Sequence, residues 1–214
     1  MTGPVHFLSF VEDEPTKHVV QRLFVYLREH CQCNIELLPG YPDVLGGFGN
    51  LKGRAPRWIK AAKASGAWFF VVTDLDRASS PNDLGRDWFG VDCLGLLPRT
   101  FLFRIAVREV ESWIMADRLA LSGYLGIAQN NLPANPDELD DPKSVLLSTI
   151  RAKCRKKIFL DMLPKGRNQH VGVAYNERLC AFVDQSWDID RAMAHSPSLA
   201  RSVARMASTL SSRG

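Results

Sequence analysis

The stretch Ala67-Trp-Phe-Phe-Val-Val-Thr-Asp-Leu-Asp76 decides the fold of this chain. Its first six residues are apolar, and its last three include two carboxylates. A short, continuous apolar run of this kind indicates a strand buried on both faces, as in parallel sheets. Gly66, directly before it, is a typical residue to end a preceding helix. We therefore expect a buried strand that leads directly into Asp74 and Asp76.

Two further apolar runs, Val5–Val11 and Phe101–Val107, also end at acidic residues. The three acidic clusters are Glu12-Asp13-Glu14, Asp74-Leu75-Asp76 and the pair Glu109 and Glu111. The carboxyl ends of parallel strands meet at one edge of a sheet, which is where α/β proteins bind their ligands. We therefore expect all three clusters to lie at that edge.

The segments between these strands have helical patterns. Apolar residues recur every three or four positions over Pro15–His30, and proline suits the first turn of a helix. A second helix is expected over Leu51–Ser65, with a short strand at Asn34–Leu38 and a short helix that includes Trp88. Strands that alternate with helices predict an α/β fold with a mostly parallel sheet flanked by helices on both faces.

The second half of the chain is mainly helical. Helices are expected over Glu111–Leu125, from Pro142 onward, over Arg178–Val183 and over Leu199–Leu210. Ser196 is the expected N-cap of the last one. We expect an α/β core at residues 1–115 and a helical C-terminal extension at residues 116–214 that packs on the core as a cap.

Composition limits the class of protein. The chain has 214 residues, which fits one domain, or one domain with a helical appendage. Its longest apolar stretches are about seven residues, far fewer than the roughly 20 needed to cross a bilayer. The N-terminus carries no basic segment, so no signal peptide is expected. The five cysteines form no Cys-x-x-Cys pair, which favours free thiols. We therefore expect a cytoplasmic protein without a membrane partner.

Positive charge is concentrated in the second half of the chain. The formal net charge is +4, and residues 151–157 alone contain five cations. A basic face beside an acidic, metal-binding pocket suits a phosphodiester substrate such as DNA or RNA. The alternative for this basic run is a solvated helix face.

The segment Gly46–Asn50 is glycine-rich and precedes a helix. It contains neither G-x-G-x-x-G nor G-K-[ST], so a nucleotide-binding loop of either type is not expected. Its backbone amides could still approach a phosphate. A plain turn is the alternative, and the sequence leaves both open.

Carboxylates at strand ends suit a divalent cation. Mg²⁺ takes oxygen ligands, usually one or two carboxylates with waters and substrate phosphates. Each cluster also has a structural alternative. The D-x-D pair can belong to a solvated turn, Asp13 or Glu14 can cap the following helix, and Glu109 and Glu111 can pair with arginines. The coincidence of three acidic strand ends favours the metal site.

Two segments, Val11-Glu-Asp-Glu-Pro-Thr16 and Val72-Thr-Asp-Leu-Asp-Arg77, resemble the two signature motifs of Toprim domains. That family places one glutamate after its first strand and a D-x-D after a later one. Primases, topoisomerases, recombination proteins and overcoming-lysogenization-defect (OLD) nucleases share it. Asp13 is a departure, since many Toprim domains have glycine after the glutamate.

Three other segments resemble an uncharacterised bacterial Toprim-like family related to OLD-type nucleases. They are Arg108–Asp117, Val171–Asn176 and Ser196–Arg201. The resemblance covers nearly the whole chain, and it implies a Toprim fold, with a Rossmann-like sheet.

The resemblance implies a role for each acid. Glu12 would be a metal ligand or a general acid/base, and Asp74 and Asp76 would hold Mg²⁺ or Mn²⁺. Glu109 or Glu111 would complete a second metal position, and Glu109 would also be catalytic. The residues expected to hold substrate phosphates are Lys143, Lys165 and Arg167.

The function expected from the resemblance is a divalent-metal-dependent nuclease that acts on DNA or RNA in bacterial anti-phage defence. Relatives of this kind work beside a P-loop ATPase. This chain has no Walker motif, so the expected partner is a separately encoded ATPase. One alternative is a non-catalytic module of the Toprim fold that binds or regulates such an ATPase. Another is a primase or nucleotidyltransferase, since the same acids can handle nucleoside triphosphates.

Overall fold

The computed structural model of the chain describes residues 3–90, 97–166 and 168–211. It divides into two compact units. The first unit contains residues 1–106 and 201–214, and the second contains residues 107–200. Both units contain large, fully buried side chains.

The first unit is built on a five-stranded sheet in which every pairing is parallel. The strands are β1 (Val5–Val11), β2 (Ile35–Leu37), β3 (Asp43–Val44), β4 (Trp68–Asp74) and β5 (Phe101–Ala106). Their order is β2-β1-β4-β5, and β3 pairs with the last two residues of β1. The prediction of an α/β fold with a mostly parallel sheet is confirmed.

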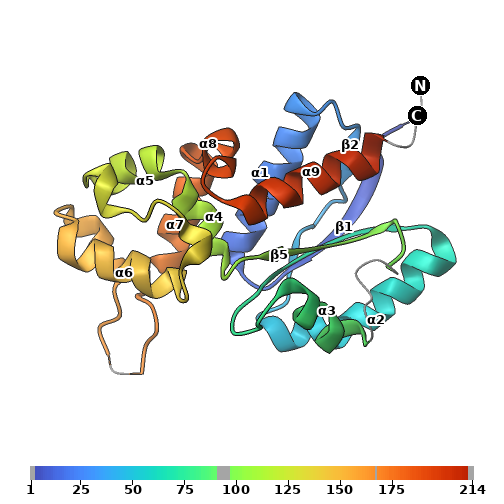
Figure 1. Cartoon of the computed structure of the whole chain (residues 1–214), viewed down its shortest axis with the longest axis horizontal. Helices are drawn as coiled ribbons and strands as arrows, with labels where there is room; N and C mark the ends of the chain where they lie inside the picture. Colours follow the sequence, from blue (N-terminus) through green and yellow to red (C-terminus); the bar gives the residue numbers. More distant parts are fainter. Residues whose placement is uncertain (1–2, 91–96, 167, 212–214) are drawn as a thin grey trace. The chain divides into compact units, whose positions relative to one another are not determined.

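Helices flank this sheet on both faces (Figure 1). They are α1 (Glu14–His30), α2 (Phe48–Ser65), α3 (Pro81–Phe89) and the C-terminal part of α9 (Pro197–Ser211). On the α1 face, Phe24 contacts Phe70 of β4 edge to face at 5.6 Å between ring centroids. On the α2 face, Trp58 stacks on Phe10 of β1 at 4.1 Å. Aromatic pairs of this kind add about 0.5–1.5 kcal/mol each beyond the area that they bury.

Two local features of the first unit differ from the sequence pattern. The strand β3 is only two residues long, too short to leave an alternation or an apolar run. Helix α2 begins at Phe48 and not at Leu51, because Gly47 takes the N-cap position with a φ of 113°. Glycine adopts such angles at little cost.

The second unit is helical. Its α-helices are α4 (Val110–Ala116), α5 (Arg118–Leu125), α6 (Pro142–Lys153), α7 (Tyr175–Gln185), α8 (Ile189–Met193) and the first turn of α9. Its short 3-10 helices are η1 (Gln129–Asn131), η2 (Pro136–Glu138) and η3 (Lys157–Met162). The expected domain boundary at residue 115 lies within α4, whereas the compact units divide at residue 106.

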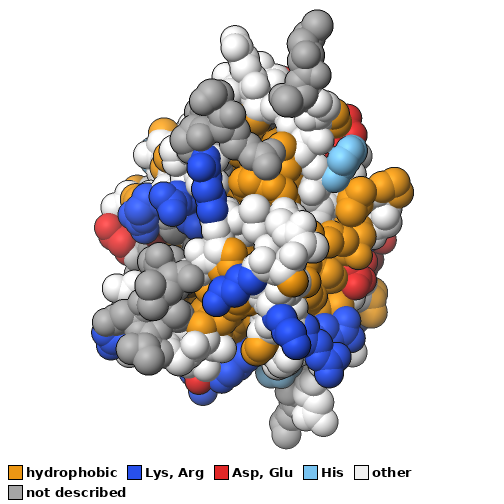
Figure 2. All heavy atoms as spheres, turned by 90° about the vertical axis from the view of Figure 1, so that its right-hand side faces the viewer, with side chains coloured by type: hydrophobic (Ala, Val, Ile, Leu, Met, Phe, Trp, Pro, Cys, Tyr) orange, Lys and Arg blue, Asp and Glu red, His pale blue; other side chains and the backbone are white. Residues whose placement is uncertain are grey.

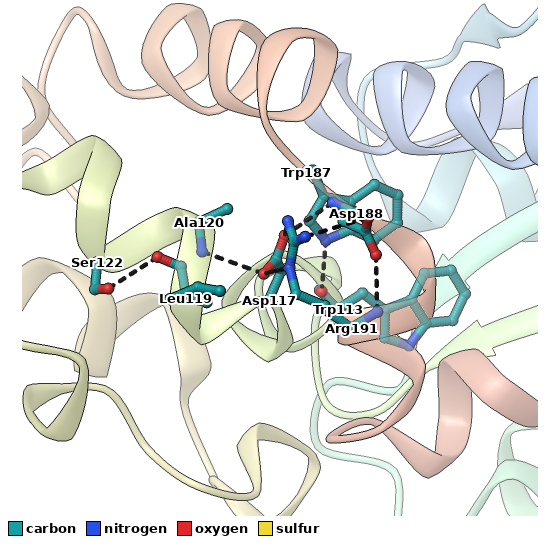
Figure 3. A network of polar contacts seen from close by, with 8 residues as sticks. All are labelled: Trp113, Asp117, Leu119, Ala120, Ser122, Trp187, Asp188 and Arg191. Carbon is teal, nitrogen blue, oxygen red and sulfur yellow. Dashed lines mark hydrogen bonds and ion pairs between the residues drawn. The ribbon is translucent and has the colours of Figure 1, made fainter.

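The segment Glu111–Leu125 is helical as expected, but it is divided into two helices. Asp117 separates α4 from α5, and its Oδ1 caps α5 by accepting a hydrogen bond from Ala120 N at 3.2 Å (Figure 3). Aspartate is among the preferred N-cap residues, since its side chain satisfies an amide that the helix leaves unpaired. An acid in an otherwise apolar helical pattern thus marks a helix start.

Ser196 caps α9 as expected, and its Oγ accepts a hydrogen bond from Leu199 N at 3.2 Å. Asp137 adds two bonds at the same helix end, because it accepts from Ser196 Oγ and from Ser198 N, both at 2.7 Å. The fully buried Trp113 donates from Nε1 to Ser198 Oγ at 2.6 Å. The indole of Trp113 therefore packs inside the helical unit.

In the described part of the chain, no helix combines the length and apolarity required of a membrane span. Cys31, Cys33, Cys154 and Cys180 are free thiols. Cys93 lies outside the described residues.

Gly172 lies where a side chain has no room. Its N donates to Met162 O at 2.8 Å, and Ala174 N donates to Asp161 O at 3.2 Å, so the loop between them is closed at its base. A Cβ at residue 172 would clash with Asp161 O and lie 2.5 Å from Leu163 O. We expect Gly172→Ala to destabilise the protein by about 1–3 kcal/mol, as other overpacked sites are.

Thermal melting followed by circular dichroism tests this prediction, with Gly166→Ala as the matched control. Gly166 belongs to the same loop, and the nearest atom to a Cβ there is 3.9 Å away. A fall in Tm of about 2–4 °C per kcal/mol is expected for Gly172→Ala alone. Equal melting temperatures for the two variants would contradict the close packing at Gly172.

Candidate functional site

Glu12 is held at the carboxyl end of β1 by two hydrogen bonds. Its Oε1 accepts from Thr73 Oγ1 and from Asp74 N, the latter at 3.1 Å. The strand register explains the contact. Phe10 pairs with Val71, and two steps further along both strands bring Glu12 beside Thr73 on the same face. The predicted glutamate and the D-x-D segment therefore lie at one edge of the sheet.

The environment of Glu12 is acidic. Burial raises the pKa of the Glu12 carboxyl above its ordinary value. The hydrogen bonds from Thr73 and Asp74 lower this pKa in part, and the negative charges of Asp76 and Asp13 raise it further. The charged neighbours that act on Glu12 are thus both acids. A bound cation would stabilise the ionised form of such a carboxyl.

Asp13 caps helix α1. Its Oδ1 accepts hydrogen bonds from Thr16 N at 2.9 Å and from Thr16 Oγ1 at 2.6 Å. Of the two acids considered as caps in the sequence, Asp13 takes the role, and Glu14 pairs with Lys17 at 3.2 Å. Asp13, the departure from the resembled motif, therefore has a structural function at the start of α1.

The strand β4 ends at Asp74, and the chain then turns. Leu75 N donates to Ala106 O at 2.9 Å, and Ala78 N donates to Leu75 O at 3.0 Å, which closes the turn. Asp76 is exposed in this turn and has a φ of 49°. Aspartate tolerates this left-handed region better than most residues. Asp74 is therefore the last residue of the strand, and Asp76 lies in the turn. The rule that residues two apart in a strand point to the same side does not apply to this pair.

The glycine-rich loop supports the end of β1. The amides of Gly46 and Gly47 donate to Glu12 O at 3.1 and 3.2 Å. Both glycines have positive φ, at 70° and 113°. Because these two amides fix the backbone of Glu12, the structure favours a supporting turn over a phosphate-binding loop.

A pocket of about 640 Å³ opens beside Asp76. Phe48, Leu75 and Leu84 supply apolar parts of its wall. Its charged parts are three carboxylates and one guanidinium, from Asp76, Asp83, Asp87 and Arg77. Sites for small ligands and cofactors usually have volumes of about 300–1,000 Å³. The pocket is therefore large enough for a nucleotide unit next to the D-x-D segment.

The acids at this edge do not form a ready metal site. Among residues 3–90, 97–166 and 168–211, no group of three or more His, Cys, Asp or Glu side chains is placed to hold a metal ion. Glu12, Asp74 and Asp76 nevertheless have the oxygen donors that Mg²⁺ and Mn²⁺ take. The donor chemistry fits a hard cation, and some of the side chains would have to turn to bind it.

Glu109 and Glu111 belong to the second unit and share one lysine. Lys143 N donates to Glu109 Oε2 at 2.8 Å. Lys143 Nζ lies 3.8 Å from Glu109 Oε1 and 3.5 Å from Glu111 Oε1. The buried Glu111 also accepts a hydrogen bond from Tyr175 OH at 2.9 Å. Lys143, expected to hold a substrate phosphate, thus contacts the two acids expected to bind a second metal.

Lys165, another expected phosphate ligand, lies in the segment that follows η3. Lys165 is exposed, and its Nζ pairs with Asp161 at 2.9 Å. Arg167 lies outside the described residues. In the basic run at residues 151–157, Lys156 donates to two carbonyls in the last turn of α5, the shorter bond at 2.7 Å. One cation of this run is therefore used to stabilise a helix end.

Two hydroxyl groups that hold the acids were not predicted from the sequence. Thr73 directly precedes the D-x-D pair, but its bond to Glu12 follows only from the register of β1 against β4. Tyr175 lies 64 residues from Glu111, and no local pattern connects the two. Both contacts depend on tertiary structure.

Comparison with protein-family models, with curated proteins and with solved structures finds no match to this chain. The resemblance to Toprim domains therefore depends on the motifs at residues 11–16 and 72–77.

Glu12→Gln is expected to stabilise the metal-free protein at neutral pH. Because burial raises the pKa of Glu12, the folded protein binds this proton more tightly than the unfolded chain does. The free energy of unfolding therefore falls as the pH rises from the pKa of Glu12 in the unfolded chain through its higher pKa in the folded protein. Glutamine keeps the acceptor for Thr73 and removes the charge.

Melting curves over a pH series, recorded in EDTA, test this prediction. The Tm of Glu12→Gln should exceed that of the wild type near pH 7, by roughly 2–4 °C per kcal/mol, and the difference should shrink in acid. Glu14→Gln, at an exposed neighbouring acid, is the matched control and should melt close to the wild type at neutral pH. A less stable Glu12→Gln at neutral pH would contradict the prediction.

Proposed function

We propose that this protein is a divalent-metal-dependent phosphodiesterase of the Toprim type that cleaves DNA or RNA. The observation that carries the proposal is the environment of Glu12. This carboxyl is partly withdrawn from water, and its charged neighbours Asp13 and Asp76 are both acids. Acids gathered at the carboxyl edge of a parallel sheet are suited to a cation.

In this proposal Glu12, Asp74 and Asp76 hold Mg²⁺ or Mn²⁺ through carboxylate oxygens. A cation bound there would polarise a phosphoryl oxygen and lower the pKa of a water molecule. Thr73 and the amide of Asp74 both bond to Oε1 of Glu12, and Oε2 is the oxygen proposed to bind the cation. If Glu12 instead acts as the general base, with the cation held by Asp74 and Asp76, its raised pKa suits it to accept a proton from an attacking water.

The pocket beside Asp76 supports a nucleotide substrate. Its volume of about 640 Å³ matches that of small-ligand sites, and Phe48 and Leu84 offer apolar surface for a base. The motif resemblance points to the same substrate class. The proposed setting is the cytoplasm, in an anti-phage system with a separately encoded P-loop ATPase, and this setting rests on the resemblance alone.

Incubation of the purified protein with plasmid DNA and with tRNA tests the proposal. Cleavage is expected with Mg²⁺ or Mn²⁺ and not with EDTA, and calorimetric titration should detect metal binding at millimolar concentration. The assay is repeated with a candidate ATPase, since a partner could be required. If the protein neither binds the metal nor cleaves nucleic acid in any of these conditions, the enzymatic function is disproved.

A second candidate is a non-catalytic module of the Toprim fold that binds or regulates an ATPase. It is favoured by the absence, in the described part of the chain, of three metal-ligating side chains placed together. Co-purification with the ATPase and a change in its ATP hydrolysis, without any nuclease activity, would support this candidate.

A further inference from the structure

The outward face of α2 carries four cations. They are Arg54, Arg57, Lys60 and Lys63, all of them exposed. They recur at every third position, and α2 contains no acidic residue. A helix with charge of one sign along its exposed side is unusual for a surface that only meets water, where acidic and basic residues are normally mixed.

The buried side of α2 shows which face is outward. Its buried residues are Leu51, Ala55, Trp58 and Ala62. They recur every three or four positions and so form one stripe, which Trp58 anchors by stacking on Phe10 of the sheet. At 100° per residue, positions three apart are about 60° apart around the helix axis, so the four cations spread over about 180° on the side opposite the buried stripe. Packing therefore holds this cationic face away from the sheet.

None of the four cations forms a hydrogen bond or an ion pair within the described part of the chain. Lys52 of the same helix differs, since its Nζ lies 2.6 Å from Asp87 Oδ1. Like charges three or four positions apart on a helix destabilise it by about 0.2–0.5 kcal/mol per pair. An external polyanion would remove this repulsion.

Figure 2 views the molecule from the side on which α2 lies in Figure 1, and it shows more Lys and Arg than Asp and Glu side chains on that face. The surface on this side therefore favours an anionic ligand.

Helix α2 begins at the candidate site. Its first residue, Phe48, lines the pocket beside Asp76, and the amide of Gly47 is bonded to the carbonyl of Glu12. At 1.5 Å per residue, the four cations lie about 9 to 23 Å along the helix from Phe48. The cationic face spans about 14 Å, the axial length of about four nucleotides of one strand.

We propose that the cationic face of α2 binds the phosphates of a nucleic acid strand that extends from the pocket beside Asp76. The inference deepens the proposed function and rests on it for the identity of the polyanion. It assigns substrate binding to the same compact unit that contains Glu12 and Asp76. The competing surface is the basic run at residues 151–157 of the second unit.

A comparison of two variants tests the proposal. In one, all four cations of α2 are replaced (R54Q/R57Q/K60Q/K63Q). In the other, four exposed cations of the second unit are replaced (R151Q/K153Q/R155Q/K157Q). Both variants lose four positive charges. A difference in their affinity for nucleic acid therefore shows which surface binds it and is not an effect of net charge. Binding of labelled single-stranded DNA, duplex DNA and RNA is measured by fluorescence anisotropy in EDTA over a series of salt concentrations.

The α2 variant is expected to bind the preferred nucleic acid about tenfold more weakly or worse, and the slope of log K against log salt should fall by about 3. The variant of the second unit should stay close to wild type. Circular dichroism checks the fold, and the double variant R54Q/R57Q provides a milder change that should give an intermediate slope.

Three results would overturn the proposal. They are unchanged binding by the α2 variant, loss of binding by the second-unit variant alone, and wild-type binding to anionic phosphatidylserine vesicles but to no nucleic acid. Because binding is measured in EDTA, it is independent of cleavage. If the protein binds nucleic acid through α2 but cleaves none, this inference holds and the proposed phosphodiesterase activity is disproved.

Discussion

Asp74→Asn is expected to lower metal-dependent cleavage of nucleic acid by about 100-fold or more, at least the loss seen when groups that support a metal site are removed. Asparagine has the shape of aspartate but no charge, so it is a weaker ligand for a hard cation. The variant should fold, because the bond from residue 74 to Glu12 comes from the backbone amide. The pairing of β4 with β5 is also made by the backbone.

Asp76→Asn is expected to have a similar effect on cleavage. The choice of asparagine matters, because residue 76 has a φ of 49°. Asparagine tolerates this left-handed conformation, whereas alanine would add roughly 1–2 kcal/mol of strain. A loss of activity in Asp76→Asn can therefore be assigned to the missing charge and not to a distorted turn.

Cleavage rates at saturating Mn²⁺, together with calorimetric titration of the metal, measure both effects. The matched control is Glu14→Gln, which removes an exposed acid of the same cluster that pairs with Lys17. This control should cleave at the wild-type rate. If Asp74→Asn and Asp76→Asn cleave as fast as the control, these two acids do not hold the metal.

The sheet could be predicted because its strands carry their own signal. In β4 six of seven residues are buried, so almost every position is apolar and the run cannot be mistaken for an amphipathic helix. The strand β1 is less uniform, with four of its seven residues buried, but its observed bounds equal the expected ones. The short β3 has no such signal, since it forms only where the chain passes beside the end of β1.

The break between α4 and α5 was missed for a different reason. The apolar spacing over Glu111–Leu125 gives no signal at Asp117, whose side chain is fully buried and bonded to groups far along the chain. Local periodicity counts apolar spacings and gives no weight to a tertiary partner 74 residues away. The same limit applies to Lys143, which was expected to hold a substrate phosphate and which contacts Glu109 and Glu111.

The sequence predicts where the acids of the candidate site lie on the strands, but it does not predict their hydrogen bonds. The sequence places Glu12 and Asp74 at strand ends, and parallel pairing of the two strands brings them together. The neighbour of Glu12 depends on the register between β1 and β4. These strands are joined by a long crossover, and a sequence pattern does not specify their register. Thr73 therefore enters the site only through the structure.

Asp117→Ala is expected to destabilise the second unit by about 3 kcal/mol. The side chain of Asp117 is fully buried and joins three segments (Figure 3). Its Oδ1 accepts from Ala120 N at 3.2 Å and from Arg191 Nε at 2.8 Å. Its Oδ2 accepts from Asp188 N at 2.8 Å and from Arg191 Nη2 at 2.9 Å. These bonds also hold the pKa of Arg191 above its ordinary value.

The size of the expected loss follows from these parts. An N-cap contributes about 1 kcal/mol, and a hydrogen bond to a charged group about 1.5–3 kcal/mol. Breaking a buried ion pair costs about 3–5 kcal/mol when the remaining charge stays buried. Arg191 is 43% exposed, so water can solvate its guanidinium after the change. The estimate therefore lies at the lower end of that range.

Urea and thermal unfolding of Asp117→Ala, compared with Asp117→Asn and Glu177→Gln, separate the contributions. A fall in Tm of about 6–12 °C is expected for alanine. Asparagine keeps an acceptor for the cap and loses the charge, so its effect should be intermediate. Glu177 pairs with Arg178 at 3.6 Å but is 72% exposed, and exposed pairs contribute about 0–1 kcal/mol. If Asp117→Ala melts no lower than Glu177→Gln, the buried network does not stabilise the helical unit, and the junction between α4 and α5 must depend on apolar packing alone.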